Sequence, residues 1–308
     1  MAAVLNTNAA SLYASKNLQT AQSKMAGSVE RLSSGLRINR AKDDAAGLGI
    51  ANALTQQING ANQGVRNLND GISMVQTAEG AIAAAQEMAQ RILTLATQGA
   101  NGTLGTSERT ALQSEMRQLM TAIDGIGGRT KFSGNSLLNN NTDGSASAAD
   151  ITLQVSNNTT DIITLSKSAF NKIGVGTAGS GDINTDGNSF TLGGGSALMT
   201  KINVANVRGT GSAAATAMQD VQSAANTYIT TLSTQRSLLG AYQNQIEFTV
   251  SNTTELASNL SSARSNVQDT DYASETASLT KGQILQQAAT AMLAQANQMP
   301  NVILSLLK

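Results

Sequence analysis

The chain has no histidine, no cysteine and no tryptophan, and its aromatic residues are four tyrosines and four phenylalanines. Without histidine or cysteine it cannot build the usual zinc and haem sites, Ser-His-Asp or Cys-His catalytic centres, disulfides or thiol redox sites. Most enzyme classes are therefore excluded. We assign no catalytic residue and expect no cofactor.

Net charge is also missing, because 20 basic and 20 acidic side chains cancel. A neutral chain has no electrostatic attraction for nucleic acid or for an anionic membrane, and it resists self-association little. We therefore expect neither nucleic acid nor a membrane as a partner.

Long apolar runs are absent as well. The first basic residue is Lys16, and no basic segment followed by an apolar one resembles a secretory signal. No stretch approaches the roughly 20 apolar residues that span a bilayer. We expect no cleaved signal peptide, so that export would depend on another signal.

Helical periodicity is what the sequence does contain. Small and apolar residues alternate by three and four over residues 51–96, interrupted only by Glu79 and Gln86, and the spacing recurs over 112–126 and 225–267. The first seam comprises Ala51, Leu54, Ile58, Ala61, Val65, Leu68, Ile72, Val75, Glu79, Ile82, Gln86, Ala89, Leu93 and Ala96, and the last comprises Ala225, Tyr228, Leu232, Leu239, Tyr242, Ile246, Thr253, Leu256, Leu260, Ala263 and Val267. Such spacing predicts long helices packed side by side.

Both ends of the chain carry narrower apolar stripes. Residues spaced by seven are Leu18, Met25 and Leu32 near one end and Leu285, Met292, Met299 and Leu306 near the other. Alanines surround them, so an isolated pair of such helices would bury little apolar area and be marginally stable. We expect Pro300 to end or limit the last helix, since proline lacks a backbone N–H.

The middle of the chain has a different pattern. Apolar residues alternate with polar ones over 151–155 and 163–165, on either side of Asn157 and Asn158, which predicts a hairpin; shorter strands are expected at 189–192 and 202–204. The predicted fold class is mainly α: a long, coiled-coil-like helical bundle built from both chain ends, with a small central β-containing insertion.

Several segments together resemble bacterial flagellins. These are residues 33–48, which resemble that family's link between two helices, 131–138, which resemble its hairpin, and 235–244, 263–273 and 294–300, which stand in flagellin order. The resemblance covers about residues 1–138 and 205–308.

This resemblance implies a structural subunit that is exported unfolded through the flagellar channel and polymerises outside the cell into a motility filament. The implied partners are other flagellin copies, hook-associated junction and cap proteins and an export chaperone. It also implies that residues 1–40 and 280–308 form an inner filament core, 41–138 and 205–279 a helical rod, and 139–204 an exposed variable insertion. The seven stripe residues are the expected polymerisation contacts, because many stacked copies can cover what one copy leaves exposed.

Two further patterns are candidate binding sites. Asp182, Asn184 and Asp186 are spaced like the first half of a calcium loop, although Gly193 stands where a bidentate glutamate is required, so that a metal-free turn is the competing interpretation. Residues 174–179 match a dinucleotide fingerprint without a following helix, which favours a plain surface loop.

Acidic pairs and one charged patch have structural alternatives. Asp43 with Asp44, and Asp269 with Asp271, are expected to cap helices and to pair with neighbouring cations such as Arg40. The family resemblance implies that Arg91, Leu95 and Glu115 contact an innate immune Toll-like receptor; the alternative is that Arg91 and Glu115 only join helices.

The sequence is compatible with two other functions. The insertion could bind surface glycans as a lectin or adhesin, or the chain could be a hook-filament junction protein with similar helical ends. Binding of the insertion to glycans would support the first, and self-polymerisation from short seeds separates flagellin from the second.

Overall fold

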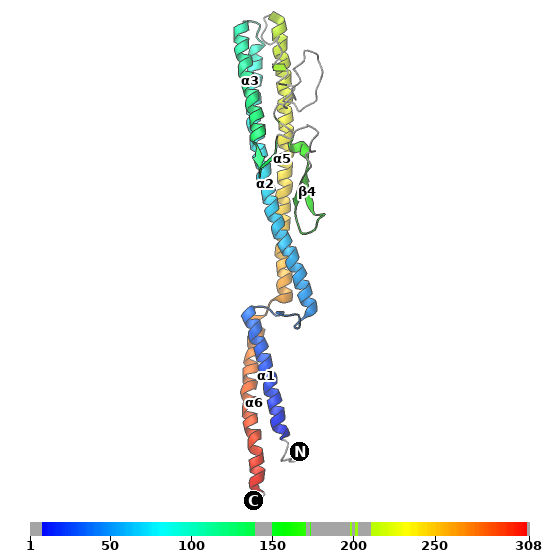
Figure 1. Cartoon of the computed structure of the whole chain (residues 1–308), viewed down its shortest axis with the longest axis vertical. Helices are drawn as coiled ribbons and strands as arrows, with labels where there is room; N and C mark the ends of the chain where they lie inside the picture. The colour runs from blue at the N-terminus through cyan, green and yellow to red at the C-terminus, as the bar shows by residue number, and fades with distance from the viewer. Residues whose placement is uncertain are drawn as a thin grey trace. The chain divides into compact units, whose positions relative to one another are not determined.

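A computed structural model describes residues 8–138, 150–170, 173, 198, 201–202 and 211–306 (Figure 1). The long helices are α1 (Ala9–Ser34), α2 (Ala45–Gly99), α3 (Thr106–Arg129), α5 (Gly211–Gln268) and α6 (Tyr272–Leu306). Two antiparallel strand pairs join β1 (Lys131–Phe132) to β2 (Asn135–Ser136) and β3 (Ile151–Gln154) to β4 (Ile162–Leu165), and a 3-10 helix, η1, covers Lys167–Phe170. The predicted mainly α class with a small β-containing part is confirmed.

The chain divides into two compact units. One contains residues 1–59 and 257–308, and the other contains residues 60–256. Helices α2 and α5 contribute to both units. The predicted boundaries at 40, 138, 204 and 279 describe layers of a filament and remain predictions.

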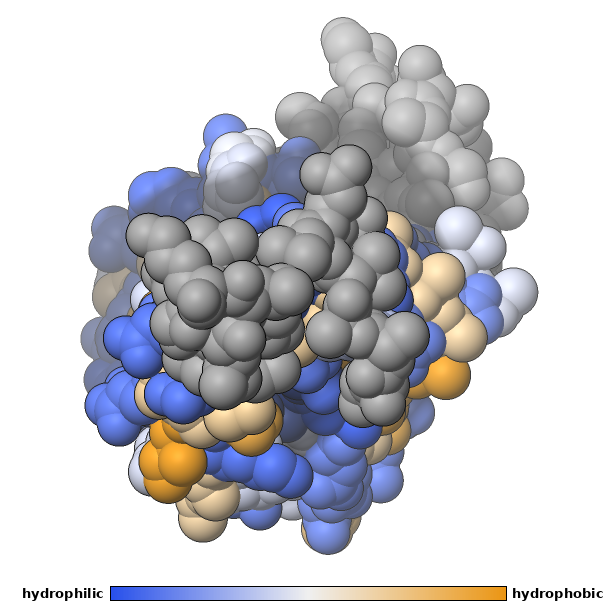
Figure 2. Space-filling view, turned by 90° about the horizontal axis from the view of Figure 1, so that it is seen from below, coloured by the Kyte–Doolittle hydropathy of each residue, from blue (hydrophilic) through white to orange (hydrophobic). Residues whose placement is uncertain are grey.

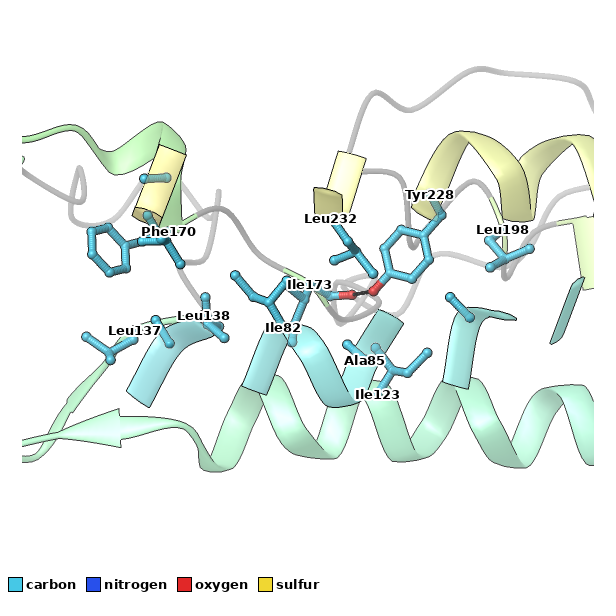
Figure 3. Close-up of a cluster of buried hydrophobic side chains, with 14 of the residues drawn as sticks. Ile82, Ala85, Ile123, Leu137, Leu138, Phe170, Ile173, Leu198, Tyr228 and Leu232 are labelled. Atoms are coloured by element: carbon cyan, nitrogen blue, oxygen red, sulfur yellow. Dashed lines mark hydrogen bonds between the residues drawn. The ribbon is translucent and has the colours of Figure 1, made fainter. Parts of the chain in front are cut away.

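The core of the second unit is built by the inward faces of α2, α3 and α5. Ile82, Ile92, Ile123 and Leu232 are at most 1% exposed and belong to one apolar cluster. Figure 3 shows part of this cluster, with side chains from all three helices pointing into one interior. The periodic spacing of the sequence therefore reports a shared helical core.

The predicted seam of α2 is confirmed at every second position over residues 61–96 and is displaced by one residue at the others. Ala61, Leu68, Val75, Ile82, Ala89 and Ala96 are buried as predicted. Gly64, Gly71, Ala78, Ala85 and Ile92 are buried, whereas the predicted members Val65, Ile72, Glu79, Gln86 and Leu93 are half-buried on its flank. The seam thus has no polar interruption, because smaller neighbours occupy the inward positions.

The two polar residues on that flank have a partner on α5. The guanidinium of Arg236 donates to Glu79 Oε1 at 3.3 Å and to Gln86 Oε1 at 3.2 Å. The seam of α5 is confirmed at Ala225, Leu232, Leu239 and Ile246. It is wrong at Leu256, which is 49% exposed.

The predicted hairpin is confirmed, and it packs closely against two glycines of α2. A Cβ added to Gly64 would lie 1.6 Å from the carbonyl oxygen of Val155, and one added to Gly71 would lie 2.4 Å from Leu153. Asn67 donates from Nδ2 to the carbonyl of Gln154 at 3.0 Å. Strand β3 and Val155 after it can lie this close to α2 only because the helix has no side chain at these two positions.

Helix side chains also hold the segment that follows the hairpin. Tyr242 Oη accepts from the Ser166 backbone N–H at 3.1 Å, Tyr228 Oη donates to the Ile173 carbonyl (Figure 3), and Gln113 Nε2 donates to the Ile202 carbonyl at 2.5 Å. Ile173 and Ile202 are fully buried. This part of the central segment therefore completes the core.

Of the two shorter predicted strands, only the first residue of the one at 202–204 lies within the described residues. Lys201 and Ile202 are helical, so the strand predicted at 202–204 is wrong at its first residue. Its other residues, and the strand predicted at 189–192, lie outside the described residues.

A tight turn closes the β1–β2 pair. Ser133 has φ of 49° and Gly134 has φ of 85°, so two consecutive residues adopt left-handed backbone angles between the paired strands. Two-residue hairpin turns need this conformation, which glycine adopts at little cost. The hairpin that the family resemblance implied at 131–138 is confirmed.

The chain leaves its helical path after α1 and again after α5, and these two interruptions lie side by side. The Arg37 backbone N–H donates to the Gln268 carbonyl at 2.7 Å, and the Thr270 N–H donates to the Gly35 carbonyl at 2.9 Å. Gly35 ends α1 with φ of 72°. These bonds let both halves of the chain interrupt their helices at one place without losing backbone partners.

Helix α6 runs through Pro300 to Leu306. The prediction that Pro300 ends or limits this helix is therefore wrong. Proline removes only its own N–H bond to the residue four positions earlier, and a helix can continue when another donor replaces that bond.

Candidate assembly surface

Helices α1 and α6 pack against each other through small residues. Ala14, Ala21 and Ser28 of α1 and Ala296 of α6 are between 5% and 8% exposed. A Cβ added to Gly282 would lie 3.5 Å from the Cβ of Met25, so the two backbones approach closely. Because the buried side chains are small, this contact removes little apolar area from water.

The larger apolar side chains of this pair remain outside it. Exposed fractions are 71% for Leu12 and Tyr13, 60% for Ile284 and 65% for Met292. Seven of the twelve large hydrophobic residues that are exposed in the described parts belong to these two helices: Leu12, Tyr13, Val29, Tyr272, Ile284, Leu285 and Met292. Figure 2 shows apolar residues gathered in separate patches on an otherwise hydrophilic face. An uncovered apolar surface of this kind is typical of an interaction site.

The predicted polymerisation residues divide into three groups. Leu18, Met25 and Leu32 are half-buried in the α1–α6 pair. Leu285 is 45% exposed and Met292 is 65% exposed, so both are available to a neighbouring molecule. The side chains of Met299 and Leu306 lie outside the described residues, although both positions are helical.

Helix capping is confirmed for Asp44 and Asp271, whereas Asp43 binds the backbone of the linker before α2. Asp43 Oδ2 accepts from the backbone N–H groups of Arg40 and Asn39, and Asp44 Oδ1 accepts from Gly47 N–H at 2.8 Å near the start of α2. Asp271 Oδ1 accepts from Ala273 N–H at 2.9 Å at the start of α6. These carboxylates shape the two helix breaks.

The electrostatics of this linker follow from those bonds. The Arg40 N–H lowers the pKa of Asp43, against a smaller opposing effect of desolvation. Arg40 does not pair with Asp43 or Asp44 as predicted; its guanidinium lies 2.6 Å from Glu30. The pairing differs because Asp43 already accepts backbone donors.

Arg91 and Glu115 join α2 to α3. Arg91 donates from Nε and Nη2 to Glu115 Oε1 at 3.0 and 2.8 Å, and both side chains are about half exposed, at 55% and 44%. Leu95 is 1% exposed and lies in the core. The first two residues are therefore accessible to a partner, and the Leu95 side chain is not.

The remaining predicted sites fall outside the described residues. This applies to Asp182, Asn184 and Asp186 of the calcium-like loop and to the glycine-rich residues 174–179. Among the described residues, no group of three or more acidic side chains is arranged to hold a metal ion. No helix within those same ranges is long and apolar enough to cross a membrane.

Asn8 contributes to this surface in a way that the sequence pattern does not predict. Its side chain caps α1 and also donates to the Ala296 carbonyl at 2.7 Å. An asparagine before a helical stripe signals a cap. The second bond links residues 288 positions apart, and no local pattern reveals it.

Family models match most of the chain. Residues 5–143 match the bacterial flagellin N-terminal helical region, and residues 213–307 match the bacterial flagellin C-terminal helical region. The matched regions contain α1, α2 and α3 at one end and most of α5 and α6 at the other.

Full-length relatives agree. The chain is 34% identical to polar flagellin F of Vibrio parahaemolyticus, with 100% of both chains covered. It is 35% identical to a flagellin of Halalkalibacterium halodurans, with 99% of this chain and 100% of the relative covered.

Two solved structures of flagellar proteins match parts of the chain. A putative flagellar hook-associated protein from Vibrio parahaemolyticus has a TM-score of 0.58 at 13% identity, covering 74% of this chain and 100% of that one. A flagellin from Bacillus cereus is 25% identical, with a TM-score of 0.44 over 65% of this chain and 94% of that one. On the family models and the full-length relatives, this chain belongs to the bacterial flagellins, which are structural subunits of the extracellular flagellar filament and not enzymes.

Proposed function

We propose that this filament subunit joins other copies of itself through the outward apolar residues of the α1–α6 pair. The observation that supports the proposal is the exposure of Leu285 and Met292 on α6 and of Leu12 and Tyr13 on α1. Covering a leucine or methionine side chain contributes on the order of 2 kcal/mol. Four such residues repeated in every copy supply a strong drive for assembly.

A second copy is the occupant that the chemistry favours. The chain is neutral, so identical copies do not repel one another. The exposed residues lie on two different helices, and a contact between unlike surfaces continues into an open filament when its rotation does not close a ring. The relatives that span the whole chain are flagellins, in which copies of one chain form the filament.

Charged substitutions on α6 test this surface. Chains carrying Leu285→Lys and Met292→Lys should elongate short filament seeds at less than about a tenth of the normal rate, because a buried lysine charge is costly at an apolar contact. Light scattering measures elongation, and circular dichroism checks that helix content is retained.

A matched control adds the same charge elsewhere on the helix. Gln283→Lys with Gln295→Lys places two lysines at exposed polar positions of α6. Normal elongation by the control and by the test variant would reject the surface. Normal elongation by the control alone would support it, and it would also argue against a junction protein that cannot self-polymerise.

Export in an unfolded state is part of the proposal. The α1–α6 pair buries mainly alanine, serine and glycine, so its packing opposes unfolding weakly. The exposed apolar residues of α6 suit a chaperone that shields this helix before export, and they also suit the junction and cap proteins at the two ends of a filament. Copurification of the chaperone with wild-type chain but not with Leu285→Lys, Met292→Lys chain would support shielding of this face.

The Arg91–Glu115 pair supports a contact with an innate immune receptor. Both charges are accessible and held in a fixed geometry. Glu115→Gln should weaken receptor activation by monomers several-fold while changing thermal stability little, because exposed ion pairs contribute at most about 1 kcal/mol. Unchanged activation would leave the pair with only its role between α2 and α3.

Binding by the central insertion also remains a proposal. Calcium would be held by Asp182, Asn184 and Asp186, and surface glycans would meet the polar loops around them. Calorimetric titration with millimolar calcium should give heat that Asp182→Ala with Asp186→Ala abolishes. No heat would remove the calcium proposal, and no signal on a glycan array would remove the glycan proposal.

A further inference from the structure

Asn8 uses both ends of its side-chain amide at the beginning of α1. Its Oδ1 accepts from the Ser11 backbone N–H at 3.1 Å, which caps the helix. Its Nδ2 donates to the Ala296 carbonyl of α6 at 2.7 Å. One side chain therefore fixes the start of α1 and a point on α6 together.

The Ala296 carbonyl is available because of Pro300. In an α-helix each carbonyl accepts from the N–H four residues later, and α6 is helical at both positions. Proline has no N–H, so the Ala296 carbonyl has no donor from position 300. Pro300 is the only proline in the sequence, so no other helical carbonyl loses its donor to a proline.

The remainder of the α1–α6 contact is built mainly from small side chains. Ala14, Ala21 and Ser28 are the buried residues of α1, and Gly282 and Ala296 are buried on α6, whereas Ala288, Ala291 and Ala294 are exposed. Sliding one helix by a turn of about 5.4 Å would bring Gln286 to the place of Gly282 beside Met25, so packing at that level favours the same alignment. Polar groups with one partner are known to fix register in such helix pairs.

We propose that Asn8 and Pro300 form a matched pair that sets the axial register of α1 against α6. A second bond at the same level, from Ser11 Oγ to Asn297 Oδ1 at 3.0 Å, favours the same alignment. The register determines which apolar residues of α6 lie level with Leu12 and Tyr13. This last consequence rests on the proposed assembly surface, whereas the register itself does not.

Paired cysteines measure the register directly, because the chain has no cysteine of its own. Met25→Cys with Gly282→Cys reports the native alignment, since a Cβ at 282 lies 3.5 Å from that of Met25, within the range a disulfide needs. Met25→Cys with Gln286→Cys reports a slip of one turn. Each full-length chain is mixed as a minority into wild-type filaments and oxidised mildly, and the ratio of the two cross-linking yields is compared.

Asn8→Asp separates the two bonds of Asn8. The variant keeps an oxygen for the Ser11 N–H but places a second acceptor against the Ala296 carbonyl. We expect the ratio of native to slipped cross-links to fall about tenfold, the effect of losing one hydrogen bond and leaving its acceptor unpaired. An unchanged ratio, or no native cross-link with Asn8 intact, would overturn the proposal.

Pro300→Ala tests whether the proline is the other half of the pair. It restores an N–H that can donate to the Ala296 carbonyl within α6, so Asn8→Asp should then change the ratio less than about twofold. An equal fall in both backgrounds would show that Asn8 acts independently of Pro300. The assembly surface is judged separately, because Leu285→Lys with Met292→Lys should slow elongation and leave the ratio unchanged.

Discussion

The Tyr228 side chain lies almost completely buried in the core of the second unit. It is 1% exposed, and its hydroxyl donates to the Ile173 carbonyl. Burial raises its pKa well above the ordinary value near 10, and the charge of Asp124 raises it further. The neutral hydroxyl is thus part of the folded state.

This environment predicts a loss of stability at alkaline pH. Because the folded pKa exceeds the unfolded one, the contribution of Tyr228 is complete below about pH 10 and is lost as pH rises from there toward the folded pKa. Tyr228→Phe should cost about 1 kcal/mol at neutral pH, and the difference from wild type should shrink above pH 10. Urea unfolding between pH 7 and 11 measures it, and a constant difference would contradict the assignment.

Two glycines of α2 should respond in opposite directions to the same substitution. Gly64→Ala should destabilise the second unit by about 1–3 kcal/mol, because the new Cβ collides with the Val155 carbonyl. Gly80→Ala has no neighbour within 4 Å and should stabilise α2 by up to about 1 kcal/mol. Thermal unfolding of both variants tests the seating of the hairpin, and two changes of the same sign would refute it.

At the scale of helices, the burial of Ala85 in place of Gln86 on α2 predicts different costs of substitution at the two positions. Ala85 is fully buried, whereas its neighbour Gln86 is half-buried beside Arg236. Ala85→Leu should cost about 1–3 kcal/mol through overpacking. Gln86→Leu should change the free energy of unfolding by at most about 0.5 kcal/mol. Similar costs at the two positions would favour the phase expected from the sequence.

The same helix shows how far sequence alone could lead. Spacing by three and four was sufficient to predict α2, α3 and α5, because burial of one face is a local property of a helix. It could not choose between Ala85 and Gln86, since alanine and glycine carry little hydropathy and the choice depends on which helix approaches which side. At alternate positions the prediction therefore falls one residue late, on Val65, Ile72 and Leu93.

The central segment was harder to predict for another reason. Alternation was enough for the hairpin from Ile151 to Leu165, yet the bonds from Tyr242 to Ser166 and from Gln113 to Ile202 join residues 76 and 89 positions apart. The exposed residues Leu285 and Met292 were identified by their spacing. Leu285 and Met292 are exposed whereas Leu18 and Met25 are half-buried. This difference in exposure depends on how α1 pairs with α6, and the sequence of one helix alone does not contain it.

For the molecule as a whole, removal of the C-terminal part of α6 separates folding from assembly. A chain lacking residues 285–308 should keep the core of the second unit and remain largely helical, because that core contains no residue of α6. It should fail to elongate seeds, since Leu285, Met292 and the partner of Asn8 are gone. Elongation at the rate of the intact chain would contradict the role of the terminal pair.

The bond from Asn8 to Ala296 spans 288 positions, almost the length of the polypeptide. Contacts of such separation close only after every intervening residue has become available. A chain that is threaded end-first through a narrow passage can therefore form local helices early, but it cannot unite its two extremities until both have emerged. Closure of this pair thus requires a chain that reaches at least Ala296, and any chain that ends before that residue lacks the contact.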